Sequence, residues 1–368
     1  MSKKFCLFFV FLYAALILFF SVLLFAMPKS DFSPTENRML ADFPSFSAYS
    51  FFDGSYMEKF SDFCSDRFPF RSSLLAIDAA TELALGKLES DTVMTGRDGN
   101  LIKRLEYSDL SQLKANIEAI KNLRKFAERH GADSLFFCAP RSVDVLADFC
   151  PFSFLGERYG EVWKEIGEAA TVTDELKRRA NAGEYVFYKT DHHWTSLGAY
   201  CAYAALGKEL GFEPFPLSDF TPKKLSDCFY GTTYSSALIP GAVPDELFAL
   251  RYQGDSQITV TDPSTGKKSG IYDFTALEGS SKYNFFLGGN KARLRVEGKE
   301  KAELVIIKDS FANSVIPFLA RHYNIEIIDP RYLREPLGSL LEKLYSDGKS
   351  PTLLILFCID TLTEKIGL

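Results

Sequence analysis

Segments of helical periodicity alternate with short apolar runs along most of the chain. Between Ser108 and His130, apolar residues recur at three- and four-residue spacing, which predicts an amphipathic helix with Ser108 as its N-cap. The same periodicity predicts helices over Thr195 to Leu210 and Phe311 to His322. Runs typical of buried strands are Ser134–Cys138, Tyr185–Tyr188, Leu304–Ile307, Ile325–Ile328 and Leu353–Phe357.

This alternation of strands and helices predicts an α/β fold. Because the strands are continuous apolar runs, we expect a mostly parallel sheet with helices on both faces. Residues 257–298 differ, since turn signals at Pro263–Gly266 and Gly288–Asn290 separate short alternating segments. These segments predict a β-hairpin that leaves the main sheet.

The N-terminal segment is of a different kind. From Phe5 to Met27 the chain has 23 residues without a charge, and a helix of that length crosses a hydrocarbon core of about 30 Å. This predicts a transmembrane helix or a signal peptide. The segment exceeds the roughly 7–15 residues of a signal-peptide core, and no small-x-small cleavage pattern follows it, which favours an uncleaved anchor. Lys3 and Lys4 favour a cytoplasmic N-terminus, with the remaining chain outside.

Composition narrows the classes of protein that fit this pattern. The chain has 368 residues, 46% of them hydrophobic and 24% charged, as in folded globular proteins. Its 42 basic and 48 acidic residues give a net charge of −6 without a basic run, which argues against nucleic-acid binding. Outside the span, six cysteines form no CxxC pair, so a zinc site is not expected. We expect an anchor over 1–30, a leader over 31–90 that packs on the domain, and the main domain over 91–368.

Lys189–Ser196 is the first segment that carries chemistry. It contains Asp191, His192 and His193 between a predicted strand and a predicted helix, where open α/β sheets place their sites. Imidazole and carboxylate groups suit a metal ion, but no HExxH motif or further cluster completes a ligand set. A histidine that only caps a turn is the structural alternative.

Ile306–Ser314 is the second such segment, because a predicted strand turns there into a predicted helix at Ser310. A serine at that turn leaves the carboxyl edge of the sheet, and the first N–H groups of the helix face an oxyanion formed there. The hydroxyl needs a base, for which Asp191 and His193 are a matched pair. The alternative is that Ser310 only caps the helix.

At these residues the chain resembles a known family. The string Asp191–Trp194 is the name-giving motif of the DHHW proteins, which are related to the periplasmic alginate O-acetyltransferases of the SGNH hydrolase superfamily. Further segments similar to that family's landmarks extend from about residue 31 to the C-terminus. They are Thr35–Leu40, Asp66–Arg71, Gly96–Leu101, Ala139–Arg141, Phe229–Thr232, Gly288–Asn290 and Asp329–Tyr332.

The resemblance implies a permuted, flavodoxin-like version of the SGNH hydrolase fold, with the triad residues in the order Asp, His, Ser. It implies Ser310 as the acyl-accepting nucleophile, His193 as its general base and Asp191 as the carboxylate that orients the imidazole. Lys308 stands where the superfamily has glycine, which leaves the construction of the oxyanion hole open. Candidates for oxyanion or substrate contacts are Asn290, Arg331, His192 and Trp194. The alternatives are a surface position for Arg331, support of the site or packing for His192, and the core, which we favour, for Trp194.

The function implied by the resemblance is acyl transfer. We expect a single-pass membrane protein with an extracytoplasmic domain that O-acetylates a cell-surface polysaccharide through an acetyl-serine, without metal or cofactor. The acetyl group would come from a membrane-bound O-acyltransferase partner, because acetyl-CoA is not available outside the cell. The alternatives are a carbohydrate acetylesterase of the same fold and a non-catalytic carbohydrate-binding protein of the envelope.

Overall fold

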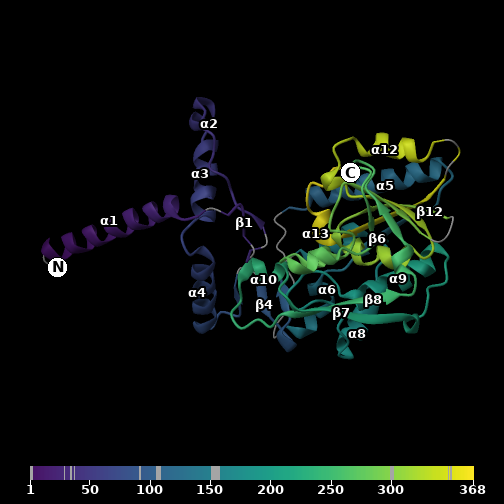
Figure 1. The fold of residues 1–368 in the computed structure, drawn as a ribbon, viewed down its shortest axis with the longest axis horizontal. Helices are drawn as coiled ribbons and strands as arrows, with labels where there is room; N and C mark the ends of the chain where they lie inside the picture. Colours follow the sequence, from purple (N-terminus) through teal and green to yellow (C-terminus); the bar gives the residue numbers. More distant parts are fainter. Residues whose placement is uncertain are drawn as a thin grey trace. The chain divides into compact units, whose positions relative to one another are not determined.

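The computed structural model describes residues 3–28, 30–33, 35–36, 38–90, 93–104, 109–150, 158–298, 302–346, 348 and 350–368 (Figure 1). The chain divides into two compact units. The first unit holds residues 1–90 and 235–241, and the second holds residues 91–234 and 242–368. Ser108, the expected N-cap, lies outside the described residues.

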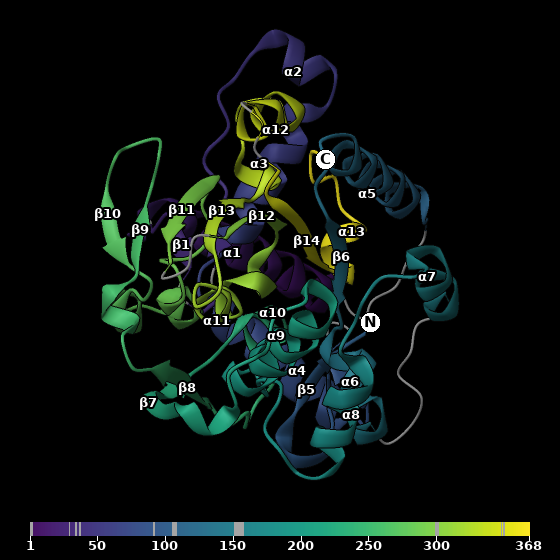
Figure 2. The ribbon, with the colours of Figure 1, turned by 90° about the vertical axis from the view of Figure 1, so that its right-hand side faces the viewer.

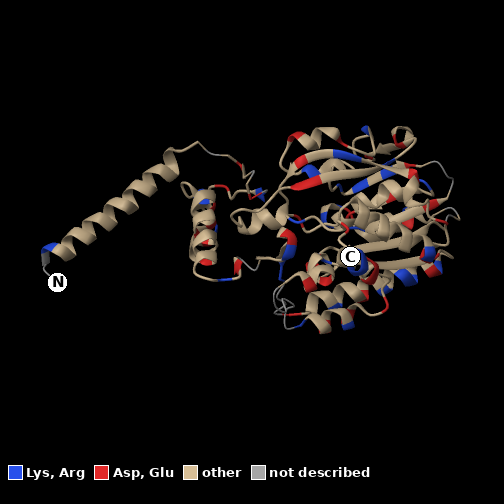
Figure 3. Cartoon of the chain, turned by 90° about the horizontal axis from the view of Figure 1, so that it is seen from below, with Lys and Arg blue, Asp and Glu red and all other residues tan. Residues whose placement is uncertain are grey.

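A long apolar helix, α1 (Lys3–Ala26), opens the first unit. Figure 3 shows that its charged residues lie only at its start. The helix is long and apolar enough to cross a membrane, and its side chains are not buried. It therefore fits a single-pass membrane anchor or a signal sequence.

Polar contacts tie together the other elements of the first unit. Arg38 donates to the carboxylates of Glu36 (2.9 Å) and Asp66 (2.6 Å), and Arg71 donates to Glu36 (3.0 Å). These residues come from two of the segments on which the family resemblance rests. The elements are β1 (Phe32–Ser33), β2 (Arg38–Met39), α2 (Ala48–Phe52), α3 (Ser55–Asp66), α4 (Arg71–Ala84) and β3 (Glu89–Ser90).

A seven-stranded sheet lies at the centre of the second unit. Its strands are β6 (Ser134–Ala139), β9 (Thr259–Thr261), β10 (Lys268–Gly270), β11 (Arg293–Glu297), β12 (Glu303–Lys308), β13 (Asn324–Ile328) and β14 (Thr352–Cys358). The strand order is β10-β9-β11-β13-β12-β14-β6. Neighbours among β13, β12, β14 and β6 are parallel, and the pairs that involve β11, β9 or β10 are antiparallel. The carboxyl ends of the four parallel strands therefore lie at one edge.

The prediction that residues 257–298 form a hairpin outside the sheet is wrong. β9 and β10 form a hairpin, but β9 also pairs with β11, and β11 pairs with β13. The segment therefore extends the main sheet. The sheet is mixed, and it is parallel only in the four strands that carry the predicted apolar runs.

Helices cover both faces of this sheet. Ile306 and Leu354 pack with residues of α9 on one face, whereas Ile307 and Ile355 pack with residues of α5 on the other (Figure 2). The helices of this unit are α5 (Ser111–Arg129), α6 (Ser142–Leu146), α7 (Tyr159–Ile166), α8 (Thr173–Asn181), α9 (Ser196–Leu210), α11 (Ile316–Leu319), α12 (Leu337–Leu344) and α13 (Ile359–Leu362). A further helix, α10, spans Thr232–Ala237.

Two predicted elements differ from the structure. Tyr185–Tyr188 is not a strand of the sheet, and its Phe187 forms an isolated bridge with Trp194. The helix expected over Phe311 to His322 is reduced to a 3₁₀ turn, Ser310–Ser314, and the short α11. Pro317 explains this interruption, because proline removes a helical hydrogen bond and clashes with the preceding turn.

Two antiparallel pairs of the second unit, both outside the seven-stranded sheet, were not predicted. β4 (Val93–Thr95) pairs with β5 (Leu101–Lys103), and β7 (Phe220–Phe229) pairs with β8 (Asp245–Tyr252). The second pair matters for the site, because its Asp245 accepts hydrogen bonds from the backbone N–H groups of Lys189 (2.7 Å) and Thr190 (2.8 Å).

Candidate active site

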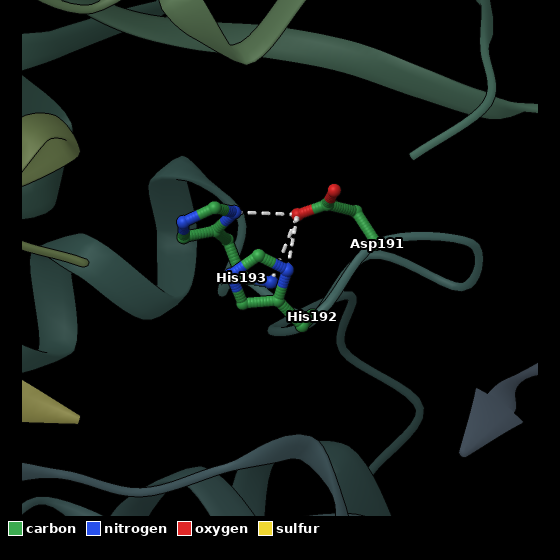
Figure 4. Close-up of side chains that lie close together, drawn as sticks. All are labelled: Asp191, His192 and His193. Carbon is green, nitrogen blue, oxygen red and sulfur yellow. Dashed lines mark hydrogen bonds and ion pairs between the residues drawn. The ribbon is translucent and has the colours of Figure 1, made fainter. Parts of the chain in front are cut away.

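Asp191 and His193 lie in the tight loop between Phe187 and Trp194. A bridge between those two residues closes the loop, and α9 begins directly after it, with Thr195 as its N-cap. The side chains of Asp191 and His193 are 2% and 6% exposed. Asp191 Oδ1 accepts a hydrogen bond from the backbone N–H of His193 (2.9 Å) and lies 2.6 Å from its ring Nδ1 (Figure 4). The carboxylate thus fixes the orientation of this imidazole.

The turn after β12 brings Ser310 to the same place. Ser310 Oγ lies 2.8 Å from His193 Nε2, the ring nitrogen that does not face Asp191. The preceding residue, Asp309, caps the 3₁₀ turn, because its Oδ1 accepts from the N–H of Phe311 (2.9 Å). The capping role considered for Ser310 therefore belongs to Asp309, and the Ser310 hydroxyl is bonded to His193.

Asp191, His193 and Ser310 thus form one continuous row of hydrogen bonds. Burial alone raises the pKa of Asp191, but electrostatic interactions with the imidazoles of His193 and His192 and the hydrogen bonds from His193 and Thr232 lower that pKa well below its usual range. The carboxylate is therefore ionised at neutral pH and stabilises a protonated imidazole. In this geometry an imidazole can take the proton of a serine hydroxyl.

The Phe229–Thr232 segment, to which the sequence assigned no role, holds the same carboxylate from its other side. Thr232 donates to Asp191 Oδ2 from its backbone N–H (2.9 Å) and its hydroxyl (3.1 Å). Gly231 permits this approach, because a Cβ at that position would lie 2.2 Å from Asp191 Cβ. Thr232 lies 41 positions from Asp191 in the sequence, so spacing could not predict this contact. Only the similarity of the Phe229–Thr232 segment to the DHHW proteins could have indicated a role for these two residues.

We expect Gly231→Ala to slow any reaction that uses the row. The added methyl group also meets Asp191 Oδ2 at 2.4 Å, so the carboxylate has to move, and a displacement of about 1 Å costs about 10²-fold in rate. The rate of Ser310 acylation by an activated ester measures this effect. Gly338→Ala is the matched control, because a Cβ there meets no atom within 4 Å. Equal rates for the two variants would contradict the role given to Gly231.

His192 lies beside the row and does not join it. Its ring centroid is 3.8 Å from that of His193, its Nδ1 bonds to the Thr232 hydroxyl, and its side chain is 40% exposed. Desolvation and the neighbouring His193 lower the pKa of His192, so its ring is neutral at pH 7.

Asp191, His192 and His193 also offer ligand atoms that lie within 4.8 Å of one another. Such a group has the chemistry to hold a metal ion. Both ring nitrogens of His193 are engaged, one by Asp191 and one by Ser310. A metal bound through His193 would therefore have to displace one of these two contacts.

Comparison with known proteins shows which proteins this chain is similar to. The DHHW protein family model matches residues 158–328. This match contains Asp191, His193 and Ser310, and it confirms the resemblance to DHHW proteins. A Pseudomonas syringae pv. tomato protein named "Probable alginate O-acetylase AlgJ" is 22% identical over 246 residues. The alignment covers 63% of this chain and 63% of the relative, so the chain spans less than two thirds of that protein's length.

Solved structures share the fold at low sequence identity. A DHHW family protein from Eubacterium siraeum has a TM-score of 0.58 and 20% identity, over 75% of this chain and 94% of that one. PatB1 from Bacillus cereus has a TM-score of 0.62 and 17% identity, over 75% of this chain and 98% of that one. The mixed α/β fold is therefore of the DHHW type.

The Trp of the DHHW string is part of the core. Trp194 is 0% exposed, and its Nε1 donates to the carbonyl of Phe311 (3.1 Å) and to Ser314 Oγ (2.9 Å). Of the two roles considered for Trp194, a wall that stacks on a sugar or a core residue, the buried ring favours the core. The ring supports the Ser310 turn from within. Tyr283 gives similar support, since its ring stacks on His193 at 3.8 Å between centroids.

Arg331 follows the end of β13 and is held by its neighbour. Its Nε and Nη2 donate to the two carboxylate oxygens of Asp329 at 2.9 and 2.8 Å, and its side chain is 23% exposed. The planar fork of the guanidinium is thus occupied by Asp329. Contact between Arg331 and a substrate stays a prediction.

Asn290 follows two glycines with left-handed backbone, at φ 70° and 81°. Its Oδ1 accepts from Nδ2 of Asn313 (3.0 Å), which lies in the same turn as Ser310. The role of Asn290 as an oxyanion donor stays a prediction. The turn itself offers fewer free backbone N–H donors than the expected helix, because the N–H of Phe311 is bonded to Asp309. A role of the N–H of Ser310, first in the turn, as the backbone donor to an oxyanion stays a prediction.

Proposed function

We propose that this chain is a membrane-anchored O-acetyltransferase that modifies a cell-surface polysaccharide through an acetyl-serine. The observation that carries the proposal is the row Asp191–His193–Ser310, in which the serine hydroxyl bonds to the base while Asp309 caps the turn. The relative named as an alginate O-acetylase supports a polysaccharide acceptor.

In the first half of the proposed reaction, the Ser310 hydroxyl attacks an acetyl carbonyl. His193 Nε2 takes the hydroxyl proton as the Oγ–C bond forms, and Asp191 stabilises the resulting imidazolium. The N–H of Ser310 and Nδ2 of Asn290 donate to the oxyanion. The leaving group receives the proton from His193, and acetyl-Ser310 remains.

In the second half, a sugar hydroxyl takes the acetyl group. His193 removes the proton of that hydroxyl, the new ester bond forms, and the bond to Ser310 Oγ breaks with return of the proton. The same residues transfer acetyl to water if no sugar is bound, which is the esterase alternative. Transfer therefore requires an acceptor that occupies the site in place of water.

The proposed location follows from α1 as an uncleaved anchor. With Lys3 and Lys4 on the cytoplasmic side, the second unit lies outside the cell. An acetyl donor then has to be delivered through the membrane. A membrane-bound O-acyltransferase is the partner that the DHHW resemblance implies.

Mass spectrometry of the full chain after exposure to p-nitrophenyl acetate tests this function. We expect an acetyl adduct on the peptide that contains Ser310. Added alginate oligosaccharide should then remove the adduct faster than buffer does and yield an acetylated sugar. Faster release into free acetate would select the esterase, and a chain without an adduct would select the non-catalytic binding protein.

A further inference from the structure

Lys308, the last residue of β12, is a charged side chain in the interior. It is 1% exposed, and the four residues before it in β12 are apolar. An ammonium group in such surroundings is strongly disfavoured unless every N–H is paired. Accordingly, burial lowers the pKa of Lys308 to about 8. A lysine retained at such a cost in solvation, two residues before Ser310, calls for a specific role.

The ammonium group has three N–H bonds and three oxygen partners. Nζ donates to Oδ1 of Asn313 (2.7 Å) and to Oδ1 of Asn290 (3.0 Å), and it lies 3.5 Å from Oδ2 of Asp329. These partners come from three different segments: the Ser310 turn, the loop before β11, and the end of β13. Lys308 therefore joins the segments that surround the nucleophile.

The contacts of Asn290 fix which side of its amide faces Lys308. Its Oδ1 accepts two hydrogen bonds, one from Lys308 Nζ and one from Asn313 Nδ2 (3.0 Å). Both lone pairs of the amide oxygen are then used, so the amide cannot turn over without losing both bonds. With Oδ1 bound in this way, the Nδ2 group is the donor side of the amide, and no hydrogen bond from it is found among the described residues. Asn290 thus has a donor group that these contacts leave unused.

We propose that Lys308 is a positioning residue that holds the Asn290 amide as an oxyanion donor for the reaction at Ser310. This inference rests on the proposed function, because it requires an acyl group to be attacked at Ser310. The ammonium fixes the amide through Oδ1, and its charge polarises the opposite N–H bonds, since linked hydrogen bonds strengthen one another.

A double-mutant cycle tests whether Lys308 acts through Asn290. We would measure the single-turnover rate of Ser310 acetylation by p-nitrophenyl acetate for wild type, Lys308→Met, Asn290→Ala and the double variant. Loss of one oxyanion donor costs about 10²–10³-fold in rate, so each single variant should slow acetylation within that range while ester affinity is retained. The double variant should be no slower than Asn290→Ala alone.

Multiplied effects in the double variant, or an unchanged rate in Lys308→Met, would overturn the positioning role. If circular dichroism shows that Lys308→Met does not fold, the acetylation rate of Asn290→Asp tests the inference instead. That variant keeps an oxygen for Lys308 but loses the N–H donor, so it should fold and acetylate slowly. A folded Asn290→Asp with the wild-type rate would refute the inference.

The outcomes separate this inference from the proposed function. A wild-type chain without an acetyl adduct on Ser310 refutes both. A wild-type chain that forms the adduct, together with independent effects of the Lys308 and Asn290 variants, refutes the positioning role alone. The choice between sugar and water as acceptor does not affect the measurement, because only the acetylation step is followed.

Discussion

Ser310→Ala is expected to reduce covalent acetylation and turnover to background. The substitution removes the atom that accepts the acetyl group, and loss of the serine in a comparable triad costs on the order of 10⁶-fold in kcat. The fold should remain, since Asp309 provides the cap and the lost Ser310–His193 hydrogen bond contributes about 1 kcal/mol. Adduct mass and thermal unfolding measure the two effects separately.

The matched control for this variant is Ser264→Ala in the turn between β9 and β10. Ser264 bonds only locally to Asp262 and should be silent in both measurements. A chelator extends the test to the metal alternative. If Asp191, His192 and His193 hold a catalytic metal, a chelator abolishes activity and Ser310→Ala is mild. That pair of results would end the nucleophilic interpretation.

Asp191→Asn is expected to slow acetylation by about 10⁴-fold, as the equivalent change does in a serine protease. The structure gives a second reason for the loss. Asp191 accepts from His193 at one oxygen and from Thr232 at the other. An asparagine has one acceptor oxygen, so its NH₂ group must face the donors of one partner.

The single-turnover rate and the adduct mass distinguish this variant from Ser310→Ala. Asp191→Asn retains the nucleophile, so acetyl-Ser310 should still accumulate during long incubation, whereas Ser310→Ala should never show the adduct. Asp262→Asn, in the β9–β10 turn, is the control for removal of one carboxylate. Wild-type acetylation by Asp191→Asn would show that the carboxylate does not act through His193.

Sequence periodicity predicts those strands whose own residues indicate whether the strand is buried. Leu304–Ile307 and Leu353–Phe357 are buried on both faces, so their continuous apolar runs are sufficient. β7 was missed because most of its residues are exposed, including Lys223 and Lys224, and its strand conformation depends on pairing with β8. Such a strand has no periodic signal of its own.

The candidate site divides in the same way. Asp191, His193 and Ser310 stand in short motifs at the ends of predicted elements, and the structure brings them together. The sequence did not indicate a functional role for Gly231, because it contributes only by leaving space next to Asp191. Lys308 did give a signal, as a charge at the end of an apolar strand, but its partners come from loops whose approach only the tertiary structure defines.

The strand order of the sheet has a consequence for how the chain folds. β6 is the first strand of the sheet in the sequence, and its neighbour is β14, the last, with Ser134 opposite Leu353. During synthesis the apolar side chains of β6 therefore stay uncovered until its partner β14 has been made. Contacts of such long range close slowly because of the entropy of the intervening loop. The edge of the sheet that β14 and β6 form is thus completed late, and until then the unfinished chain exposes apolar surface that chaperones bind.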